Sequence, residues 1–306
     1  MTPGAELLLG LLRGEGPLPG AADARWPETL ALAERHGVAP LLHEQLPGLC
    51  APIRARLREA RIAALREHQK QERALQDALR ALPDAVVFKG AAYARNLYIF
   101  PELRPAGDVD LFHPDAPGEL PGFDWHEETQ QHEQRRGWHE RTLVHRETGV
   151  QVDLHRAFAQ AERNSLDPRQ IFARSNKNAL DADDAVIIHA HNLALHELRA
   201  PLIQLVDLEL LLARCRPERV LQRARESHTL NALCAALALL ERVRPGAPEE
   251  LLREARPTLA VRWAVRRYDV SRRPLRRAEQ LLRKAVFIDR ARDRARFLFA
   301  HLRARR

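Results

Sequence analysis

Two short segments, VVFKGA at residues 86–91 and GDVDLF at residues 107–112, decide the fold of this chain. In the second segment Asp108 and Asp110 stand two positions apart inside an apolar run, so a β-strand projects both to the same face. A third acid, Asp153, has similar apolar neighbours in the later segment QVDLH. Burying like charges side by side is costly unless a cation neutralises them. Three carboxylates at strand positions after a glycine turn therefore predict a site for a hard divalent metal and phosphate.

The order of elements around these segments predicts an α+β fold with a mixed β-sheet core flanked by helices. A β-branched run, a Lys-Gly turn, an alanine-rich helix, a second strand and a hairpin-like pair of strands follow one another. The expected strands are residues 85–88, 109–112, 138–145 and 150–155, and the expected helix between the first two is 91–98.

The rest of the chain shows the 3.6-residue apolar period of amphipathic helices. We therefore expect three regions: an N-terminal helical region at 1–82, the sheet-containing core at 83–160, and a C-terminal helical domain at 161–306. The expected helices of the outer regions cover a short stripe at 7–12, then 27–46, 53–82, 184–198, 201–212, 217–229, 230–243, 248–270 and 275–305.

Composition is that of an ordinary soluble globular protein, with 45% hydrophobic and 29% charged residues in 306. The three cysteines are scattered without CxxC spacing, which argues against a disulfide framework or structural zinc and fits a reducing compartment. No basic segment precedes the short apolar stretch at the N-terminus, and no apolar run is long enough to span a bilayer. We therefore expect no membrane span and a cytoplasmic location.

The formal net charge of +8 is unevenly distributed, because residues 262–306 carry 16 Arg or Lys against four Asp or Glu. This segment could form a landing surface for a polyanion such as RNA. It could equally be a set of solvated helix faces, since only four of the 49 basic residues are lysine and the whole chain is biased toward arginine. We favour the second interpretation, because no aromatic stacking pattern accompanies the charge.

The segments KGA at 89–91, Arg104 followed by GDVD, and VDLH at 152–155 resemble the DNA polymerase β-like nucleotidyltransferase superfamily. Within it, the chain is most similar to the bacterial family of uncharacterised nucleotidyltransferases, over roughly residues 83–160. The resemblance implies a Mg²⁺-dependent enzyme that moves a nucleoside monophosphate from a nucleoside triphosphate, ATP among them, to a hydroxyl and releases pyrophosphate. The acceptor stays open between a peptide or protein, a small metabolite and an RNA end, with nucleic acid less favoured.

The resemblance also implies roles for the acids. Asp108 and Asp110 would hold Mg²⁺, and Asp153 would complete a second metal position and help to deprotonate the attacking hydroxyl. A structural alternative is that the Asp-x-Asp merely marks the end of a strand. The addition of the third acid and the glycine turn favours the catalytic interpretation.

The turn would bind the triphosphate. Gly90 would allow a close approach of the backbone, and the helix beginning near Ala91 would point its N–H groups at phosphate oxygens. Lys89 and Arg104 would neutralise phosphate charge. Alternatively, Lys89 is simply solvated, and Arg104 forms a structural pair with Asp108 or with the nearby Glu102.

One departure from the superfamily pattern supports a different hypothesis. Many members carry glycine or serine after the first glycine of the turn, and the serine hydroxyl helps to bind phosphate, whereas this chain has Ala91. The protein could therefore be a catalytically inactive nucleotide-binding or partner-binding relative. All three acids are nevertheless present.

His155, His196 and Asp207 are possible acceptor or support residues, the last two in the helical half. His155, beyond the third acid, could contact acceptor or phosphate or lie on the surface. Asp207 stands among apolar neighbours and should need a buried partner, for which we expect His196 or Arg199. This contact would be either structural or part of an acceptor- or base-binding site. His189 and His196 are seven residues apart on one helix, too far to share a metal.

Overall fold

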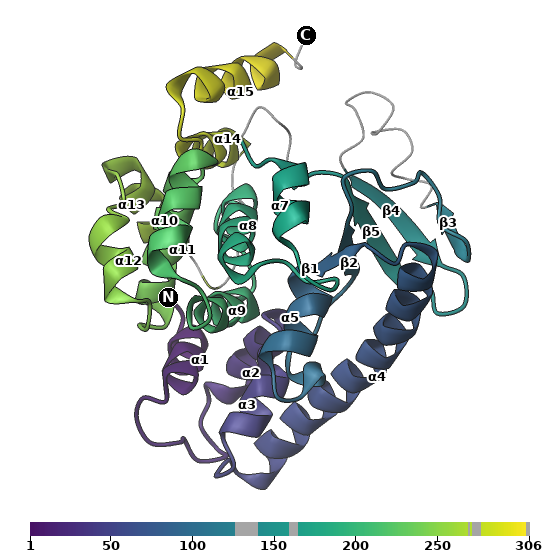
Figure 1. Cartoon of the computed structure of the whole chain (residues 1–306). Coiled ribbons are helices and arrows are strands. Elements are labelled where there is room, and N and C mark those ends of the chain that lie inside the picture. The colour runs from purple at the N-terminus through teal and green to yellow at the C-terminus, as the bar shows by residue number, and fades with distance from the viewer. Residues whose placement is uncertain (126–139, 159–164, 269, 271–276, 304–306) are drawn as a thin grey trace.

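The structure is a computed structural model that describes residues 1–125, 140–158, 165–268, 270 and 277–303. Helices before and after a five-stranded sheet give the α+β class that the sequence predicts (Figure 1). One apolar core cluster joins all three expected regions, with Leu57, Val152 and Leu208 as representatives. The regions therefore share a core, and their division into domains stays a prediction.

The N-terminal region is helical, as expected, with α1 Pro3–Arg13, α2 Trp26–Arg35, α3 Ala39–Gln45 and α4 Ala51–Ala81. Thr2 caps α1 by accepting a hydrogen bond from the Ala5 N–H at 3.3 Å. The single helix expected over 27–46 is wrong, because the chain turns between α2 and α3 at Gly37, whose φ of 68° favours glycine.

The sheet contains β1 Val86–Phe88, β2 Val109–Phe112, β3 Phe123–Trp125, β4 Glu140–His145 and β5 Gln151–His155. Its order is β1-β2-β5-β4-β3, with β2 parallel to β5 and the other named pairs antiparallel. Four strands match the predicted ones, although residues 138–139 of the expected third strand lie outside the described residues. The short edge strand β3 was not predicted, because three residues show no period.

The two faces of the sheet have different surroundings. On one face Val109, Leu111, Val152 and Leu154 join the main core together with residues of α4 and of α5 Lys89–Leu97. Figure 1 shows α4 and α5 along the sheet. On the other face β1 and β2 pack against α7 Pro168–Arg174 and α8 Ala182–Leu195 through a second apolar cluster. This second face also carries the acids of β2 and β5.

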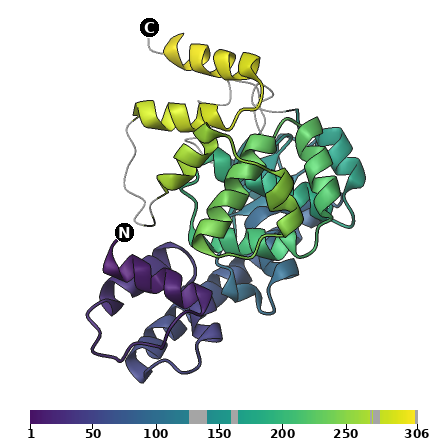
Figure 2. The same ribbon diagram turned by 90° about the vertical axis from the view of Figure 1, so that its left-hand side faces the viewer.

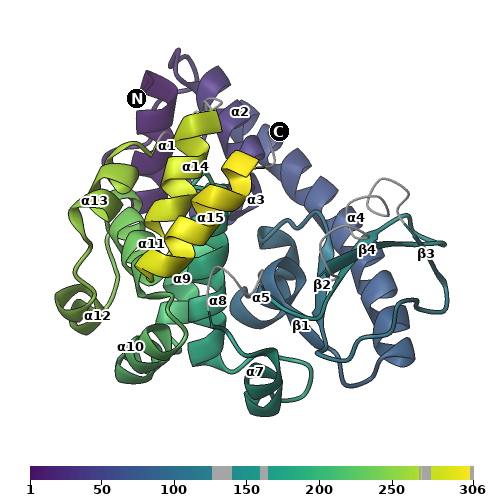
Figure 3. The same cartoon turned by 90° about the horizontal axis from the view of Figure 1, so that it is seen from above.

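The C-terminal region continues with α9 Leu202–Leu212, α10 Pro217–Glu226, α11 Leu230–Val243, α12 Glu249–Glu254, α13 Leu259–Arg266, α14 Arg277–Val286 and α15 Ala291–Arg303. In Figure 2, α14 and α15 lie at the opposite end of the molecule from the purple N-terminal helices. Viewed from above, they lie over the helical half, whereas the sheet extends to the other side (Figure 3). No described helix is both long and apolar enough to cross a membrane.

Two long helices expected in this region are interrupted. The segment 248–270 breaks at Pro257, which disfavours a helical residue before it, and Thr258 caps α13 through the Val261 N–H at 3.2 Å. The segment 275–305 breaks near Asp289, whose carboxylate accepts hydrogen bonds from the Leu230 and Asn231 N–H groups at 2.8 and 2.9 Å. The acid thus caps α11 rather than continuing its own helix. The short helix α7 was not predicted.

Candidate active site

The three predicted acids lie beside one another on the second face of the sheet. Asp110 and Asp153 are directly paired across the parallel strands β2 and β5, so their side chains project to the same side. Both are buried, at 3% and 7% exposure, and Asp108 is half-buried just before β2. Within the described residues these carboxylates do not all approach to within 4.8 Å of one another. They form an open row rather than a closed cage.

Asp110 is held by two cationic or polar partners on its Oδ1 atom. Lys89 Nζ donates to it at 2.7 Å, and His155 Nε2 lies 2.9 Å from the same oxygen. Burial opposes the ionised form of Asp110, but Lys89 and His155 outweigh burial and lower its pKa. His155 is thus buried at the site and not on the surface.

The other two acids lack such compensation. Burial, reinforced by the charges of Asp110 and Asp153, raises the pKa of Asp108 to about 6. Burial also raises the pKa of Asp153, although a hydrogen bond from Thr142 opposes the shift. Gln151 Nε2 lies 3.1 Å from Asp153 Oδ1. Because the row has more negative charge than its neighbours neutralise, its donor set suits an added hard cation.

The predicted phosphate-binding turn leads straight from β1 into α5. Lys89 has a φ of 52°, in the left-handed region, which turns the chain sharply at the end of the strand. No side-chain hydrogen bond caps the described start of α5. Its first N–H groups therefore have neither a side-chain partner nor an intrahelical acceptor, as is typical of a helix N-terminus that can bind an anion.

The need for glycine at position 90 has a cause that the sequence did not show. A Cβ at Gly90 would lie 2.6 Å from Nη1 of Arg104 and 3.0 Å from Cβ of Ala106. A larger residue at position 90 would thus collide with Arg104 and Ala106 of the protein itself, whereas from the sequence we ascribed the need for glycine to the triphosphate. Gly90 and Ala91 are both buried in the first turn of α5.

Arg104 and Asp207 are partners of each other, which corrects two expectations. Arg104 Nη2 donates to Asp207 Oδ2 at 2.8 Å and Nε donates to the same oxygen at 3.1 Å, while Tyr98 Oη donates to Oδ1 at 2.9 Å. The expected contact of Asp207 with His196 or Arg199 is wrong. Arg104 pairs with neither Asp108 nor Glu102, and its guanidinium is only 7% exposed. Its phosphate-binding role stays a prediction.

His196 lies exposed at the end of α8. The pKa of His196 is lowered mainly by partial loss of hydration and to a smaller extent by the positive charge of Lys89. The negative charge of Glu140 opposes this shift. His196 is therefore within electrostatic reach of Lys89 and Glu140, and among the described residues it has no hydrogen bond or ion pair with Asp207. Its acceptor or support role stays a prediction.

Several site residues were missed by sequence reasoning. Glu140 is paired with His155 across β4 and β5, and its Oε2 lies 3.5 Å from His155 Nδ1. Thr142 is paired in the same way with Asp153. The two-residue spacing of Glu140 and Thr142 on a predicted strand was the signal that could have found them.

Two further polar features are candidates for a site. In the first, ligand atoms of Asp77, His145 and Glu147 lie within 4.8 Å of one another. Arg73 Nη2 pairs with Glu147 at 3.2 Å and Arg80 pairs with Asp77, so arginines already balance these acids. This cluster is explained as a structural ion-pair network.

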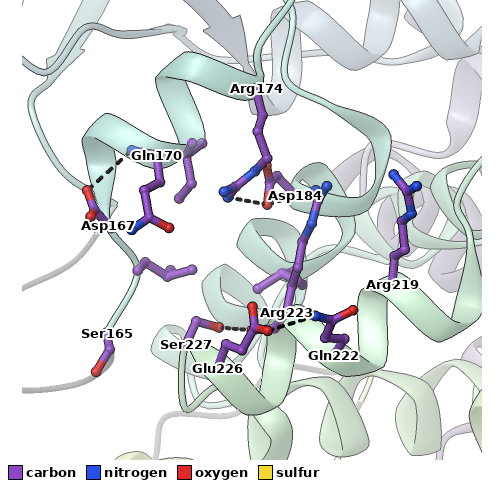
Figure 4. Close-up of a pocket in the computed structure, with 13 residues that line it drawn as sticks. Ser165, Asp167, Gln170, Arg174, Asp184, Arg219, Gln222, Arg223, Glu226 and Ser227 are labelled. Atoms are coloured by element: carbon purple, nitrogen blue, oxygen red, sulfur yellow. Dashed lines mark hydrogen bonds and ion pairs between the residues drawn. The ribbon is translucent and has the colours of Figure 1, made fainter.

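The second feature is a cavity of about 640 Å³ between α7, α8 and α10 (Figure 4). Arg174 Nε donates to Asp184 Oδ2 at 2.7 Å across its wall, and Arg223 Nη1 lies 3.1 Å from Asp184 Oδ1. Its lining includes none of the predicted site residues.

Of the comparisons with known proteins, only a family model matches the chain. No curated protein and no solved structure matches the chain. The family model described as uncharacterised nucleotidyltransferase matches residues 22–245, well over half of the 306 residues. The chain therefore belongs to the family of uncharacterised nucleotidyltransferases.

Proposed function

We propose that this protein is a Mg²⁺-dependent nucleotidyltransferase that moves a nucleoside monophosphate from a nucleoside triphosphate to a hydroxyl and releases pyrophosphate. Membership of the family supports nucleotidyl transfer in general. The observation that carries the proposal is the row of Asp108, Asp110 and Asp153 on one sheet face, directly beside the uncapped start of α5.

The acidic row is the place for the metal. Asp108, Asp110 and Asp153 would hold Mg²⁺, which when bound supplies charge neutralisation for the phosphates and favours ionisation of the attacking hydroxyl. The raised pKa values of Asp108 and Asp153 support this assignment, because they are typical of carboxylates short of positive charge. His155 supports Asp110 by holding its Oδ1 atom in place.

The start of α5 is the place for the triphosphate. The N–H groups of Gly90 and Ala91 belong to the first turn of α5, where the helix dipole favours negative charge. Lys89 supplies an ammonium group on a flexible stem beside this turn, and its Nζ can pass from Asp110 to a phosphate oxygen. Ala91 removes a hydroxyl contact but leaves the backbone donors intact.

Asp153 is the candidate general base. It lies next to Asp110 across the parallel strands, and its carboxylate projects to the same side of the sheet as that of Asp110. A hydroxyl that approaches over β5 would pass its proton to a carboxylate oxygen of Asp153. The acceptor hydroxyl would come from the side of α8, where His196 stands.

The direct test is incubation with a labelled triphosphate and Mg²⁺, comparing wild type with Asp108→Asn and Asp110→Asn. We expect label transfer and pyrophosphate release that both variants abolish while they remain folded by circular dichroism. Triphosphate binding without turnover on any acceptor would instead support the inactive nucleotide-binding alternative, for which Ala91 is the argument.

Identification of the acceptor needs a separate experiment. Candidate peptides, proteins, small metabolites and RNA are incubated with each of the four triphosphates, and mass spectrometry searches for an added nucleoside monophosphate. RNA as acceptor would further require an affinity that falls steeply with salt, as expected for binding through the arginines of residues 262–306.

A further inference from the structure

We propose that Arg104 is a positioning residue that fixes the phosphate-binding turn and the loop of Asp108 relative to each other, and that Asp207 anchors it from the helical region. This inference rests on the proposed function, since it assigns a role within the same site. It differs from a phosphate-binding role for Arg104, because the guanidinium would act through the backbone that it supports.

The anchor is a buried ion pair between distant parts of the chain. Asp207 in α9 is 0% exposed, and two of its contacts come from Nε and Nη2 of Arg104, 103 residues earlier. Tyr98, at the end of α5, donates to the other carboxylate oxygen. The planar guanidinium therefore has one orientation, which a lysine could not reproduce.

The third nitrogen of the same guanidinium faces the turn. Nη1 of Arg104 donates to the Pro105 carbonyl at 3.2 Å and occupies the space that a Cβ at Gly90 would need. The first turn of α5 thus rests on Arg104. A displacement of the guanidinium would leave the backbone donors of this turn without support.

The loop between Arg104 and Asp108 is packed on the same turn. The Cβ of Ala106 also borders Gly90, and the Ala106 carbonyl accepts a hydrogen bond from Gln71 Nε2 of α4 at 2.7 Å. Asp108 follows two residues later. Arg104 therefore sets the spacing between the backbone that would bind phosphate and the first carboxylate that would bind metal.

A double-mutant cycle between positions 90 and 104 tests this coupling. Gly90→Ala should lower kcat/KM for Mg–ATP, or for whichever of the four triphosphates is turned over, at least tenfold, because its methyl group collides with Nη1. Arg104→Lys keeps the charge but removes Nη1, so we expect a loss of about tenfold alone. In the Arg104→Lys background the added cost of Gly90→Ala should fall below threefold.

Two further variants separate positioning from simple stabilisation. Tyr98→Phe removes one hydrogen bond to Asp207 but keeps the ion pair, so its activity should stay within threefold of wild type. Asp207→Asn keeps a hydrogen-bonding side chain opposite Arg104 but removes its negative charge. Like Arg104→Lys, it should lower kcat/KM. Additive effects of Gly90→Ala and Arg104→Lys, or an Arg104→Lys enzyme within twofold of wild type, would overturn the proposal.

A second readout keeps the inference independent of turnover. Amide hydrogen exchange at residues 89–92 should be faster in Arg104→Lys and Asp207→Asn than in wild type and Tyr98→Phe, measured without nucleotide. Unchanged exchange at these amides would overturn the positioning role even in an active enzyme. Faster exchange in these two variants, with no transfer by the wild-type protein, would uphold the positioning role and reject only the proposed activity.

Discussion

The two faces of β2 and β5 are built from alternate residues of the same strands, yet they are held in different ways. On one face Val109, Leu111, Val152 and Leu154 are all 0% exposed and pack in the apolar core. The other face is almost as buried, but beside the apolar Phe112 it carries carboxylates and a histidine, joined through ion pairs and hydrogen bonds. Burial alone therefore does not distinguish core from site.

The difference lies in unsatisfied charge. The side chains of the apolar face are fully packed and carry no charge. Their burial stabilises the fold by about 25 cal/mol for each Å² removed from water. The acidic face retains two carboxylates whose pKa values are raised, which means that burial and repulsion there cost free energy. A protein keeps such a cost where a ligand relieves it.

Neighbouring residues on the two faces give the sharpest test. Asp153→Asn should lower nucleotidyl transfer by about 10³-fold or more, because a charged group of a preorganised site is lost. The free energy of unfolding without metal should not decrease, since the neutral amide removes like-charge repulsion. Radiolabel transfer and urea denaturation measure the two quantities, and retained transfer would remove Asp153 from the mechanism.

Leu154→Ala is the matched change on the opposite face. Leu154 is fully buried, so the substitution should lower the free energy of unfolding by about 3 kcal/mol through lost apolar contact and a cavity. Activity per folded molecule should stay near the wild-type value at a temperature well below the transition. A large loss of kcat with unchanged stability would contradict the separation of the two faces.

Substitution of Lys89 tests whether its ammonium group contributes to the binding of the triphosphate at the acidic face. Lys89→Gln removes the ammonium group that pairs with Asp110, and kcat/KM for the triphosphate should fall by about 10- to 100-fold, as for other charge-assisted hydrogen bonds. Lys89→Arg should recover part of this loss. Equal kcat/KM for wild type and Lys89→Gln would assign the lysine to structure alone.

The smallest expected effect concerns pH. The folded pKa of Asp108 is about 6, above its ordinary 3.8, so burial of this group lowers the stability of the metal-free fold by an amount that grows as pH rises from 3.8 and is fully present above 6. The cost shrinks as pH falls below 6 and is gone only below about 3.8. Asp108→Asn should therefore be more stable than wild type at pH 7.5, by on the order of 1 kcal/mol after screening by solvent, and closer to it at pH 5.

Thermal denaturation with and without Mg²⁺ checks this sign. Added Mg²⁺ should stabilise wild type at pH 7.5, when Asp108 is ionised, and have less effect at pH 5. Asp108→Asn should show little response at either pH. A wild-type protein that Mg²⁺ stabilises equally at both values would show that Asp108 does not take part in metal binding.

Local sequence patterns were sufficient for much of the fold and of the acidic row. The alternation in GDVDLF and QVDLH is enough to place the acids of each segment on one face, because a strand repeats every two residues. Helix ends were less predictable, since Gly37 and Asp289 interrupt apolar periods that continue on both sides. The strand β3 and the helix α7 were too short to show a period.

The sequence by itself determined which residues share a face, because side-chain direction follows from the local backbone. Only the tertiary structure decided which charges meet. Lys89, directly after β1, reaches Asp110 on the adjacent strand β2, whereas Arg104 reaches Asp207 across 103 residues of chain. No local pattern encodes the second pairing, since several cations could satisfy a buried carboxylate, and the tertiary packing brings Arg104 to Asp207. The same packing decided that position 90 must be glycine.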